Sequence, residues 1–155
     1  MYFLEQLVAE WYAYKGFFVR TNMKYGKRKK GGYEGEIDVA AYDPRDKKII
    51  HLEISTDANS WSERKQRFQK KFLTAEKYYK SLFDFEFKEV SKVAVVSLSR
   101  PKGKIDFGNN IELFLIPDLI AEIRSEMQKF DVTQSAIPEG YPLLRAIQYS
   151  VWFAK

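Results

Sequence analysis

GEIDVAAYDPRDKKIIHLEIS, residues 35–55, contains two runs of alternating apolar and polar side chains that are separated by a turn sequence. The apolar positions of the two runs are Ile37, Val39, Ala41, Ile50, Leu52 and Ile54. Such alternation is typical of a strand with one buried face, and Asp43-Pro44-Arg45-Asp46 between the runs is typical of a turn. The sequence therefore predicts two antiparallel strands, at residues 34–42 and 48–55, joined by a short turn.

Two carboxylates lie on the polar side of these strands. Asp38 and Glu53 each occupy a position near a strand end, where an unpaired carboxylate among apolar neighbours is costly. If the hairpin register brings the two polar faces together, both acids converge on one spot, as Mg²⁺ requires of one or two protein carboxylates. The backbone carbonyl of Ile54 is a natural third oxygen. The alternative is that each acid is a solvated residue at a sheet edge.

Hydrophobic periodicity outside this hairpin predicts further helices and strands. Helices are expected at residues 2–15, 61–82, 117–130 and 141–153, and strands at 17–20, 93–98 and 111–116. Residues 21–33 are expected to form a basic, glycine-punctuated loop. The resulting order, αβββαβ followed by βα and a closing helix, predicts an α/β fold with a central mixed sheet flanked by helices.

Length and composition narrow the class of protein. A chain of 155 residues, 45% of them apolar, predicts a single domain over residues 1–155. No stretch approaches the roughly 20 uncharged apolar residues of a membrane-spanning helix, and no signal-peptide pattern begins the chain. We therefore expect a soluble, cytoplasmic protein without a membrane partner. Cysteine is absent, so disulfides, thiolate metal sites and thiol nucleophiles are excluded.

The charge distribution indicates a polyanionic partner. Lys plus Arg exceed Asp plus Glu by 26 to 21, and the isoelectric point is about 9.2. An ordinary solvated surface is the alternative explanation of this excess. The cations are concentrated at residues 24–30, accompanied by Tyr25 and Tyr33, and in a second basic loop at residues 100–104.

The two predicted strands resemble the core of the PD-(D/E)XK, or restriction-endonuclease-like, nuclease superfamily. In that superfamily an αβββαβ core carries an Asp on the second strand and Glu-x-Lys on the third, and here Asp38 and Glu53 match the two acids. In many members a Glu on the first helix assists metal binding, and Glu5 takes that part. The resemblance covers residues 1–98, which implies that residues 99–155 form a C-terminal βαα extension.

The lysine position of the motif is occupied by Ser55, and a serine cannot supply a cation. In the family that lysine orients or activates the attacking water and stabilises charge at the scissile phosphate. Some relatives deliver a motif side chain from the neighbouring helix, and Lys65 is the expected substitute because it interrupts the apolar stripe of residues 61–82. The alternative is that the stem of Lys65 packs on the core while its ammonium reaches solvent. Lys71 is the second candidate, and Lys70 is expected to be solvated.

The resemblance implies a DNA endonuclease that hydrolyses phosphodiester bonds with Mg²⁺ or Mn²⁺ and is nucleoid-associated in a prokaryotic cell. The expected catalytic residues are Glu5, Asp38, Glu53 and Lys65, and the expected metal ligands are Asp38, Glu53 and the Ile54 carbonyl. The residues expected to contact DNA phosphates are Lys24, Lys27, Arg28, Lys29, Lys30, Arg100, Lys102 and Lys104. Because Ser55 replaces the lysine, a catalytically inactive DNA-binding or assembly subunit is the alternative, and an RNA-directed or protein-binding module is a third reading.

Three further features leave alternatives open. His51, the single histidine, lies on the strand face of Glu53 and is expected to be structural, or else a proton carrier or phosphate donor. Glu36, two residues before the first acid, is expected to be a strand acid rather than an extra ligand. The apolar segment at 141–153 predicts either a homodimer contact or packing across the helix at 117–130.

Overall fold

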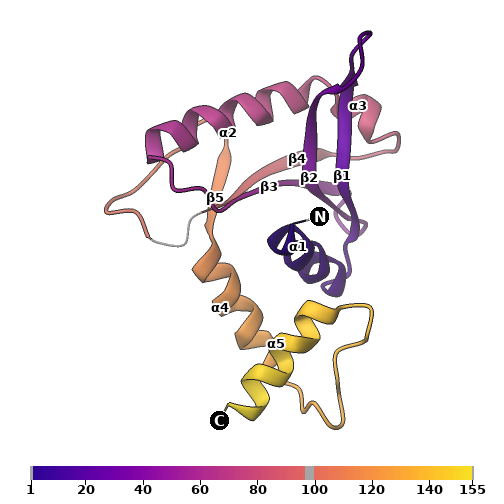
Figure 1. The fold of residues 1–155 in the computed structure, drawn as a ribbon. Coiled ribbons are helices and arrows are strands. Elements are labelled where there is room, and N and C mark those ends of the chain that lie inside the picture. Colours follow the sequence, from indigo (N-terminus) through magenta and orange to yellow (C-terminus); the bar gives the residue numbers. More distant parts are fainter. Residues whose placement is uncertain (1, 97–99, 155) are drawn as a thin grey trace.

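The computed structural model describes residues 2–96 and 100–154 of the chain (Figure 1). The helices are α1 (Phe3–Tyr14), α2 (Trp61–Glu76), α3 (Tyr79–Leu82), α4 (Ile116–Met127) and α5 (Pro142–Phe153). The strands are β1 (Phe18–Lys27), β2 (Tyr33–Asp43), β3 (Lys48–Ser55), β4 (Glu89–Val96) and β5 (Ile111–Leu115). The observed order follows the predicted αβββαβ arrangement, with the short α3 added after α2.

The strands form a five-stranded mixed sheet in the order β1-β2-β3-β4-β5. β1, β2 and β3 pair antiparallel, whereas β4 and β5 each run parallel to the preceding strand. Val39 lies opposite Leu52 and Ala41 opposite Ile50, so these apolar side chains share one face as the alternation predicts. Ile37, which the alternation places on the same face, packs instead in the cluster that contains Ile49. The predicted α/β class, with a central mixed sheet flanked by helices, is confirmed.

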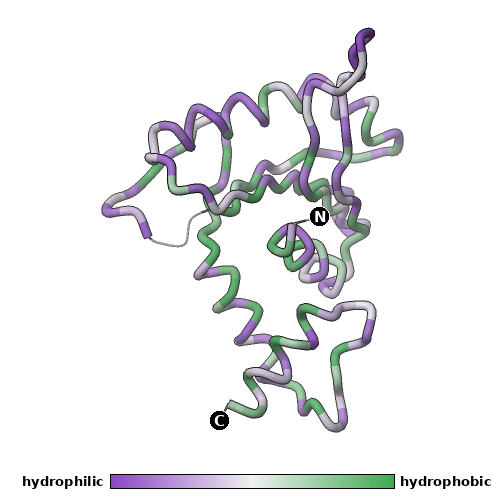
Figure 2. The backbone as a smooth tube through the Cα atoms, in the orientation of Figure 1, coloured by the Kyte–Doolittle hydropathy of each residue, from purple (hydrophilic) through white to green (hydrophobic). Residues whose placement is uncertain are grey.

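Helices cover both faces of the sheet (Figure 1). On one face, α1, α4 and α5 pack on the apolar side chains of β2, β3 and β4. On the other face, α2 and α3 pack over two smaller apolar clusters, one containing Ile49 and the other containing Phe72. Figure 2 shows that hydrophilic residues predominate at the tip of the β1–β2 hairpin and along α2. The candidate functional side chains lie on this second, more hydrophilic side of the molecule.

The first strand is longer than the sequence predicts. Residues 21–27, expected in a loop, continue β1, and the pairing with β2 extends from Phe18 opposite Tyr42 to Lys27 opposite Tyr33. Lysine, asparagine and glycine have low strand propensity, but a ladder with a complementary partner strand outweighs that preference. The predicted loop is therefore reduced to the tip of the hairpin, which projects from the body of the protein (Figure 1).

The helix predicted over residues 61–82 is divided into two. α2 ends at Glu76, and the short α3 begins at Tyr79. Ser60 starts α2, because its hydroxyl accepts a hydrogen bond from the backbone N–H of Glu63 at 3.2 Å while the Glu63 carboxylate bonds back to Ser60 N at 3.0 Å. This reciprocal capping fixes where α2 starts after β3.

The remaining boundaries lie close to their predicted positions. β4 begins at Glu89 rather than at residue 93, and residues 97–98, predicted at its end, lie outside the described ranges. α4 begins at Ile116, with Pro117 in its first turn, where the missing N–H costs nothing. Among the described helices, none is long and apolar enough to span a membrane.

The C-terminal helix packs on the body of the protein. Leu144 and Val151 are buried in the same apolar cluster as α1 and α4, as the packing interpretation of residues 141–153 predicts. Oε2 of Glu10, on α1, accepts hydrogen bonds from the backbone N–H groups of Leu143 at 2.9 Å and Leu144 at 3.0 Å. A buried carboxylate of the first helix thus caps the N-terminus of the last one.

Candidate functional site

Two acids and one lysine meet on the sheet face covered by α2. Asp38 on β2 and Glu53 on β3 lie on neighbouring strands, and Asp38 Oδ2 accepts a hydrogen bond from the backbone N–H of Ile54 at 2.9 Å. Lys71, on α2, donates to Glu53 Oε2, and its Nζ is 3.8 Å from Asp38 Oδ2. The two carboxylates thus converge as the hairpin pattern predicts. We call Asp38, Glu53 and Lys71 the acidic cluster.

Burial favours the protonated forms of the two acids. The side chain of Glu53 is 0% exposed and that of Asp38 is 12% exposed. Burial and the neighbouring Glu53 raise the pKa of Asp38 to about 7, while Lys71 opposes the rise. Burial also raises the pKa of Glu53. One ammonium therefore compensates two carboxylates only in part, and the acidic cluster favours an additional cation.

The lysine of this cluster is charged and partly exposed. Burial opposes its charge, but the carboxylates of Glu53 and Asp38 outweigh that cost and raise the pKa of Lys71. Its side chain remains 40% exposed. The ammonium can therefore leave Glu53 for solvent, or for another anion, without crossing the core.

A hydrogen-bonded chain contacts the carboxylate oxygen of Glu53 that does not accept from Lys71. His51 Nε2 lies 2.7 Å from Glu53 Oε1, and His51 Nδ1 lies 2.7 Å from the hydroxyl of Tyr79. Burial lowers the pKa of His51 to about 3, so the imidazole is neutral. Its Nε2–H then donates to the carboxylate while Nδ1 accepts from Tyr79. His51 is fully buried, and its predicted structural role fits this position better than that of a phosphate donor.

A second charged cluster lies where the motif lysine is missing. Ser55 and Arg67 both hydrogen-bond to Asp57 Oδ2, and Arg67 also donates to the Ser55 hydroxyl at 3.0 Å. Arg64 donates to Asp57 Oδ1 at 3.2 Å and to the Asp57 carbonyl at 2.7 Å. Burial opposes ionisation of Asp57, but the hydrogen bonds from Ser55 and Arg67 outweigh it and lower the pKa. We call Asp57, Arg64 and Arg67 the arginine cluster, in which two guanidiniums face one carboxylate.

A groove of about 170 Å³ lies between the β1–β2 hairpin and α2. Its lining residues are Tyr25, Glu34, Gly35, Glu36, Arg67, Lys70, Lys71 and Thr74. Arg67 and Lys71 both line it, so the arginine cluster and the acidic cluster border the same opening. One wall is the ring of Tyr25, stacked on Tyr78 with centroids 5.2 Å apart. Glycine is required at position 35, because a Cβ there would lie 2.3 Å from the Tyr25 hydroxyl.

The prediction that Lys65 substitutes for the motif lysine is wrong. Lys65 is exposed on α2, and the buried side chains of that helix are Arg64, Phe68, Phe72 and Ala75. Positions 64 and 65 both lie one turn from Phe68, so helical periodicity alone does not select between them. Lys71, the second candidate, directly precedes Phe72 and is therefore rotated from the buried stripe toward the two acids.

Glu5 and Glu36 do not contact the acidic cluster. Glu5 lies on α1, on the opposite face of the sheet from α2, and its carboxylate accepts a hydrogen bond from the backbone N–H of Tyr2 at 3.4 Å. The start of α1 is nonetheless close to the end of β3, since the Tyr2 hydroxyl is 2.7 Å from Thr56 Oγ1. Glu36 lines the groove, and its Oε1 accepts from the Asn22 amide at 3.0 Å. Glu36 is thus a strand acid at the groove rim, as expected.

The two predicted basic segments lie near opposite ends of α2 (Figure 1). The exposed cations of the hairpin are Lys24, Lys27, Arg28, Lys29 and Lys30, and none forms an ion pair within the described part of the chain. In the second segment Lys102 and Lys104 are exposed, but Arg100 is paired with Asp118, its NH1 lying 3.2 Å from Oδ2. The hairpin therefore offers more free positive charge than the loop.

The acidic cluster fits a divalent cation in its donor chemistry. Within residues 2–96 and 100–154, no group of three or more His, Asp or Glu side chains is arranged to hold a metal. Mg²⁺, however, is commonly held by one or two carboxylates together with waters and substrate phosphates. Asp38 and Glu53 supply two carboxylates whose charge Lys71 compensates only in part. The backbone N–H of Ile54 points toward Asp38 on β2. Because the N–H and carbonyl of a strand residue point to the same neighbouring strand, the Ile54 carbonyl also points toward β2.

Several residues of the site are not predictable from local sequence patterns. The partnership of Asp57 with Arg64 and Arg67 depends on the path of residues 56–60, which no periodicity describes. The two arginines are three residues apart on α2, and that spacing on one helix face was the available signal. Tyr79 is another such residue, because its hydroxyl meets His51 only after α2 ends and α3 turns.

Comparison with known proteins supports the fold. No known protein family matches the chain, and no curated protein matches it. A similar solved structure, described as a crystal structure of a protein of unknown function, AF1548, has a TM-score of 0.53 and 20% sequence identity. The match covers 94% of this chain and 78% of that one. The likeness indicates a shared arrangement of helices and strands and carries no information on activity.

Proposed function

We propose that this chain is a metal-dependent nuclease with a restriction-endonuclease-like core that hydrolyses phosphodiester bonds in DNA. The observation that carries the proposal is the contact of Lys71 with Glu53 and its approach to Asp38 at 3.8 Å. Two acids on adjacent strands and one lysine are the three residue types of the PD-(D/E)XK motif. The lysine is supplied by α2 instead of by position 55, and the αβββαβ order of elements is the one that the motif requires.

Asp38, Glu53 and the Ile54 carbonyl are the groups that would hold Mg²⁺ or Mn²⁺. When bound, such a cation supplies Lewis-acid activation of water and of the phosphate oxygens. Neutral His51 keeps the Glu53 carboxylate oriented, and the backbone N–H of Ile54 keeps Asp38 in place. The two ligands are therefore held in position by the fold before any ion arrives.

Lys71 and Arg67 serve the phosphate. Both line the groove, and the Lys71 side chain is exposed enough to turn from Glu53 toward an anion there. An ammonium beside the scissile phosphate stabilises the charge that develops during hydrolysis. Arg67 offers a guanidinium four residues earlier on α2, a geometry suited to phosphate oxygens.

DNA is the proposed substrate because free positive charge accumulates on the β1–β2 hairpin, which forms one wall of the groove. The hairpin tip, residues 28–32, carries Arg28, Lys29 and Lys30 on a two-stranded ribbon, and such a ribbon fits the major groove of B-DNA. Contacts of these lysines and arginines with phosphates do not read sequence, and they should make binding weaken steeply with salt.

The proposal is tested by incubating the protein with linear, branched and single-stranded DNA, and with RNA, in Mg²⁺ or Mn²⁺. We expect cleavage of DNA that stops with EDTA and with Asp38→Ala, while Lys65→Ala, a lysine of the same helix outside the site, cleaves normally. Calorimetric titration with Mn²⁺ should show binding that Asp38→Ala abolishes. Cleavage unaffected by Asp38→Ala, or cleavage of RNA alone, would contradict the proposal.

A catalytically inactive DNA-binding subunit is the second candidate. The observation that favours it is the engagement of Glu53 by Lys71, because that pair already compensates part of the charge that a metal would meet. The same experiment separates the two candidates. Tight DNA binding without Mn²⁺ binding or cleavage supports the inactive subunit.

A further inference from the structure

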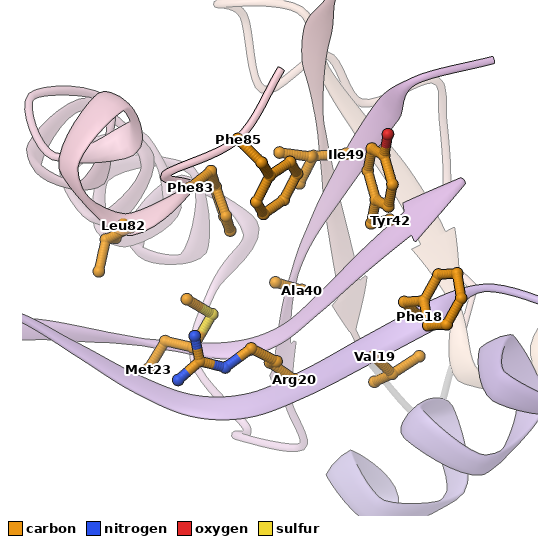
Figure 3. A pocket seen from close by; sticks show the side chains of 10 residues that line it. All are labelled: Phe18, Val19, Arg20, Met23, Ala40, Tyr42, Ile49, Leu82, Phe83 and Phe85. Carbon is orange, nitrogen blue, oxygen red and sulfur yellow. The ribbon is translucent and has the colours of Figure 1, made fainter. Parts of the chain in front are cut away.

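We propose that the hollow between the β1–β2 hairpin and residues 82–85 binds one unpaired nucleobase of the substrate strand, with the adjoining phosphate against Arg20 (Figure 3). The inference rests on the proposed function, because a nucleic-acid strand must first reach the acidic cluster. It adds a substrate class, namely DNA with an unpaired nucleotide close to the scissile phosphate.

The hollow has the size and lining of a small-molecule site. Its volume is about 340 Å³, within the range of ligand pockets, and almost all of its lining side chains are apolar. Ala40 lies at its floor, where the small side chain leaves space, and the rings of Tyr42, Phe83 and Phe85 stand around it (Figure 3). The Tyr42 and Phe85 rings meet edge to face with centroids 4.9 Å apart. A flat aromatic base fits such walls by stacking.

The rim of the hollow exposes aromatic surface. Phe85 is 48% exposed and Phe18 is 69% exposed, although both border an opening into the apolar core. Exposed aromatic surface beside a cavity is typical of a ligand or partner site. Every base offers a π-face, so an aromatic rim tolerates any base sequence.

The positive charge of Arg20 favours a nucleotide, rather than an apolar side chain of a peptide, as the occupant of the hollow. Arg20 is the charged residue of the lining, and no carboxylate borders the hollow. Within the described ranges its guanidinium has no ion pair and no hydrogen-bond partner, and it is exposed. A guanidinium forms paired hydrogen bonds with phosphate oxygens, which an apolar peptide would not use.

The position of the hollow links it to the acidic cluster. Ala40 follows Asp38 by two residues on β2, which places it about 7 Å further along the same strand face. That distance places the hollow within a few nucleotides of the acidic cluster along a bound strand. A base in a duplex is stacked on both faces and cannot enter a hollow, so occupancy requires an unpaired or extruded base.

The test is a fluorescence titration with a DNA duplex that ends in a single-stranded arm containing 2-aminopurine, compared with the fully paired duplex. EDTA prevents metal-dependent hydrolysis during binding. We expect binding to quench the fluorescence of 2-aminopurine in the arm. Phe85→Ala and Arg20→Ala should each weaken binding of the armed DNA by about 10-fold. Phe85→Ala should leave the affinity for the fully paired duplex unchanged. Phe85→Leu, which keeps apolar bulk without the ring, should behave like Phe85→Ala.

Two matched controls remove an exposed ring and an exposed charge elsewhere. Phe153→Ala on α5 and Arg124→Ala on α4 should bind the armed DNA like the natural protein. Equal affinity for both DNAs, or unchanged affinity in Phe85→Ala, would overturn the base site while leaving the nuclease proposal standing. Binding to neither DNA would overturn both. Unchanged thermal unfolding of each variant shows that the loss is local.

Discussion

The acidic cluster and the arginine cluster both use side chains of α2 near the end of β3, and they carry opposite net charge. Glu53 and Ser55 are two residues apart on β3, and Lys71 and Arg67 are four residues apart on α2, so strand and helix meet twice. In the acidic cluster two carboxylates share one ammonium. In the arginine cluster one carboxylate, Asp57, serves two guanidiniums.

In the proposed function, this difference in charge gives the two clusters complementary tasks. In the acidic cluster the two carboxylates are largely buried, and burial together with the neighbouring Glu53 raises the pKa of Asp38 to about 7 although Lys71 opposes the rise. The cluster has less positive than negative charge, which favours uptake of a cation. The arginine cluster is more exposed and has positive charge to spare, which favours an anion. A phosphodiester in complex with a divalent cation needs both kinds of site side by side, and each prediction below alters one cluster while leaving the other intact.

The largest effect is expected from Lys71→Ala. Removing a cation that faces the phosphate should slow DNA cleavage by about 100- to 1000-fold. The affinity for Mn²⁺ should rise at the same time, because the ammonium no longer competes for Glu53. Cleavage assays and calorimetry measure the two quantities, with Lys65→Ala as the control. Parallel losses of cleavage and metal affinity would mean that Lys71 is a structural support only.

Tyr79→Phe removes a single hydroxyl from the chain that orients Glu53. We expect the affinity for Mn²⁺ to fall by about 10-fold, because His51 loses the partner that fixes its tautomer. Tyr78→Phe is the matched control, since its hydroxyl interacts with Glu34 instead. Equal behaviour of the two variants in a Mn²⁺ titration would refute this orienting role.

Arg67→Ala should have the converse effect to Lys71→Ala. It leaves Mn²⁺ affinity unchanged and weakens DNA binding by about 10-fold, which is the value of a charged hydrogen bond. The comparison variant is Arg124→Ala on α4, which removes the same charge far from the groove. Fluorescence anisotropy at several salt concentrations measures the change. A drop in metal affinity would show that the two clusters are not independent.

The smallest effect concerns stability against pH. The pKa of Asp57 is lowered, so its contribution is present above the ordinary aspartate pKa of 3.8 and is lost as the pH falls below that value. The pKa of Asp38 is raised to about 7, so its contribution is present below pH 3.8 and is lost as the pH rises through 7. Asp57→Asn should therefore weaken the decline in stability on the acid side, below pH 3.8. Asp38→Asn should weaken the decline in stability between about pH 3.8 and pH 7. Thermal unfolding without metal across this range measures both slopes, with shifts of a few degrees expected.

The hairpin and the meeting of its two acids could be predicted because strand alternation fixes side-chain direction. A period of two assigns Asp38 and Glu53 to one face, and a turn of fixed length then sets the register. The length of β1 could not be predicted, because its polar residues are held by pairing with β2 and not by their own preference.

The identity of the lysine could not be predicted, because helical spacing leaves a tolerance of one residue. In the sequence Lys65 interrupts the apolar stripe, yet in the folded protein Arg64 is the side chain that is buried with the apolar residues of α2. Lys71 lies beside the stripe, where its long side chain reaches over to the strands. The arginine cluster depends on the irregular path after β3, and local sequence patterns do not describe that path.

The cap that Glu10 places on α5 ties together parts of the chain that are 133 and 134 residues apart. Such a distant contact carries a loop-closure cost, which folding must offset. Without α5, the Glu10 carboxylate loses both of these backbone donors, and its burial becomes more costly. The stability of the packing of α1 therefore depends in part on the last helix of the chain.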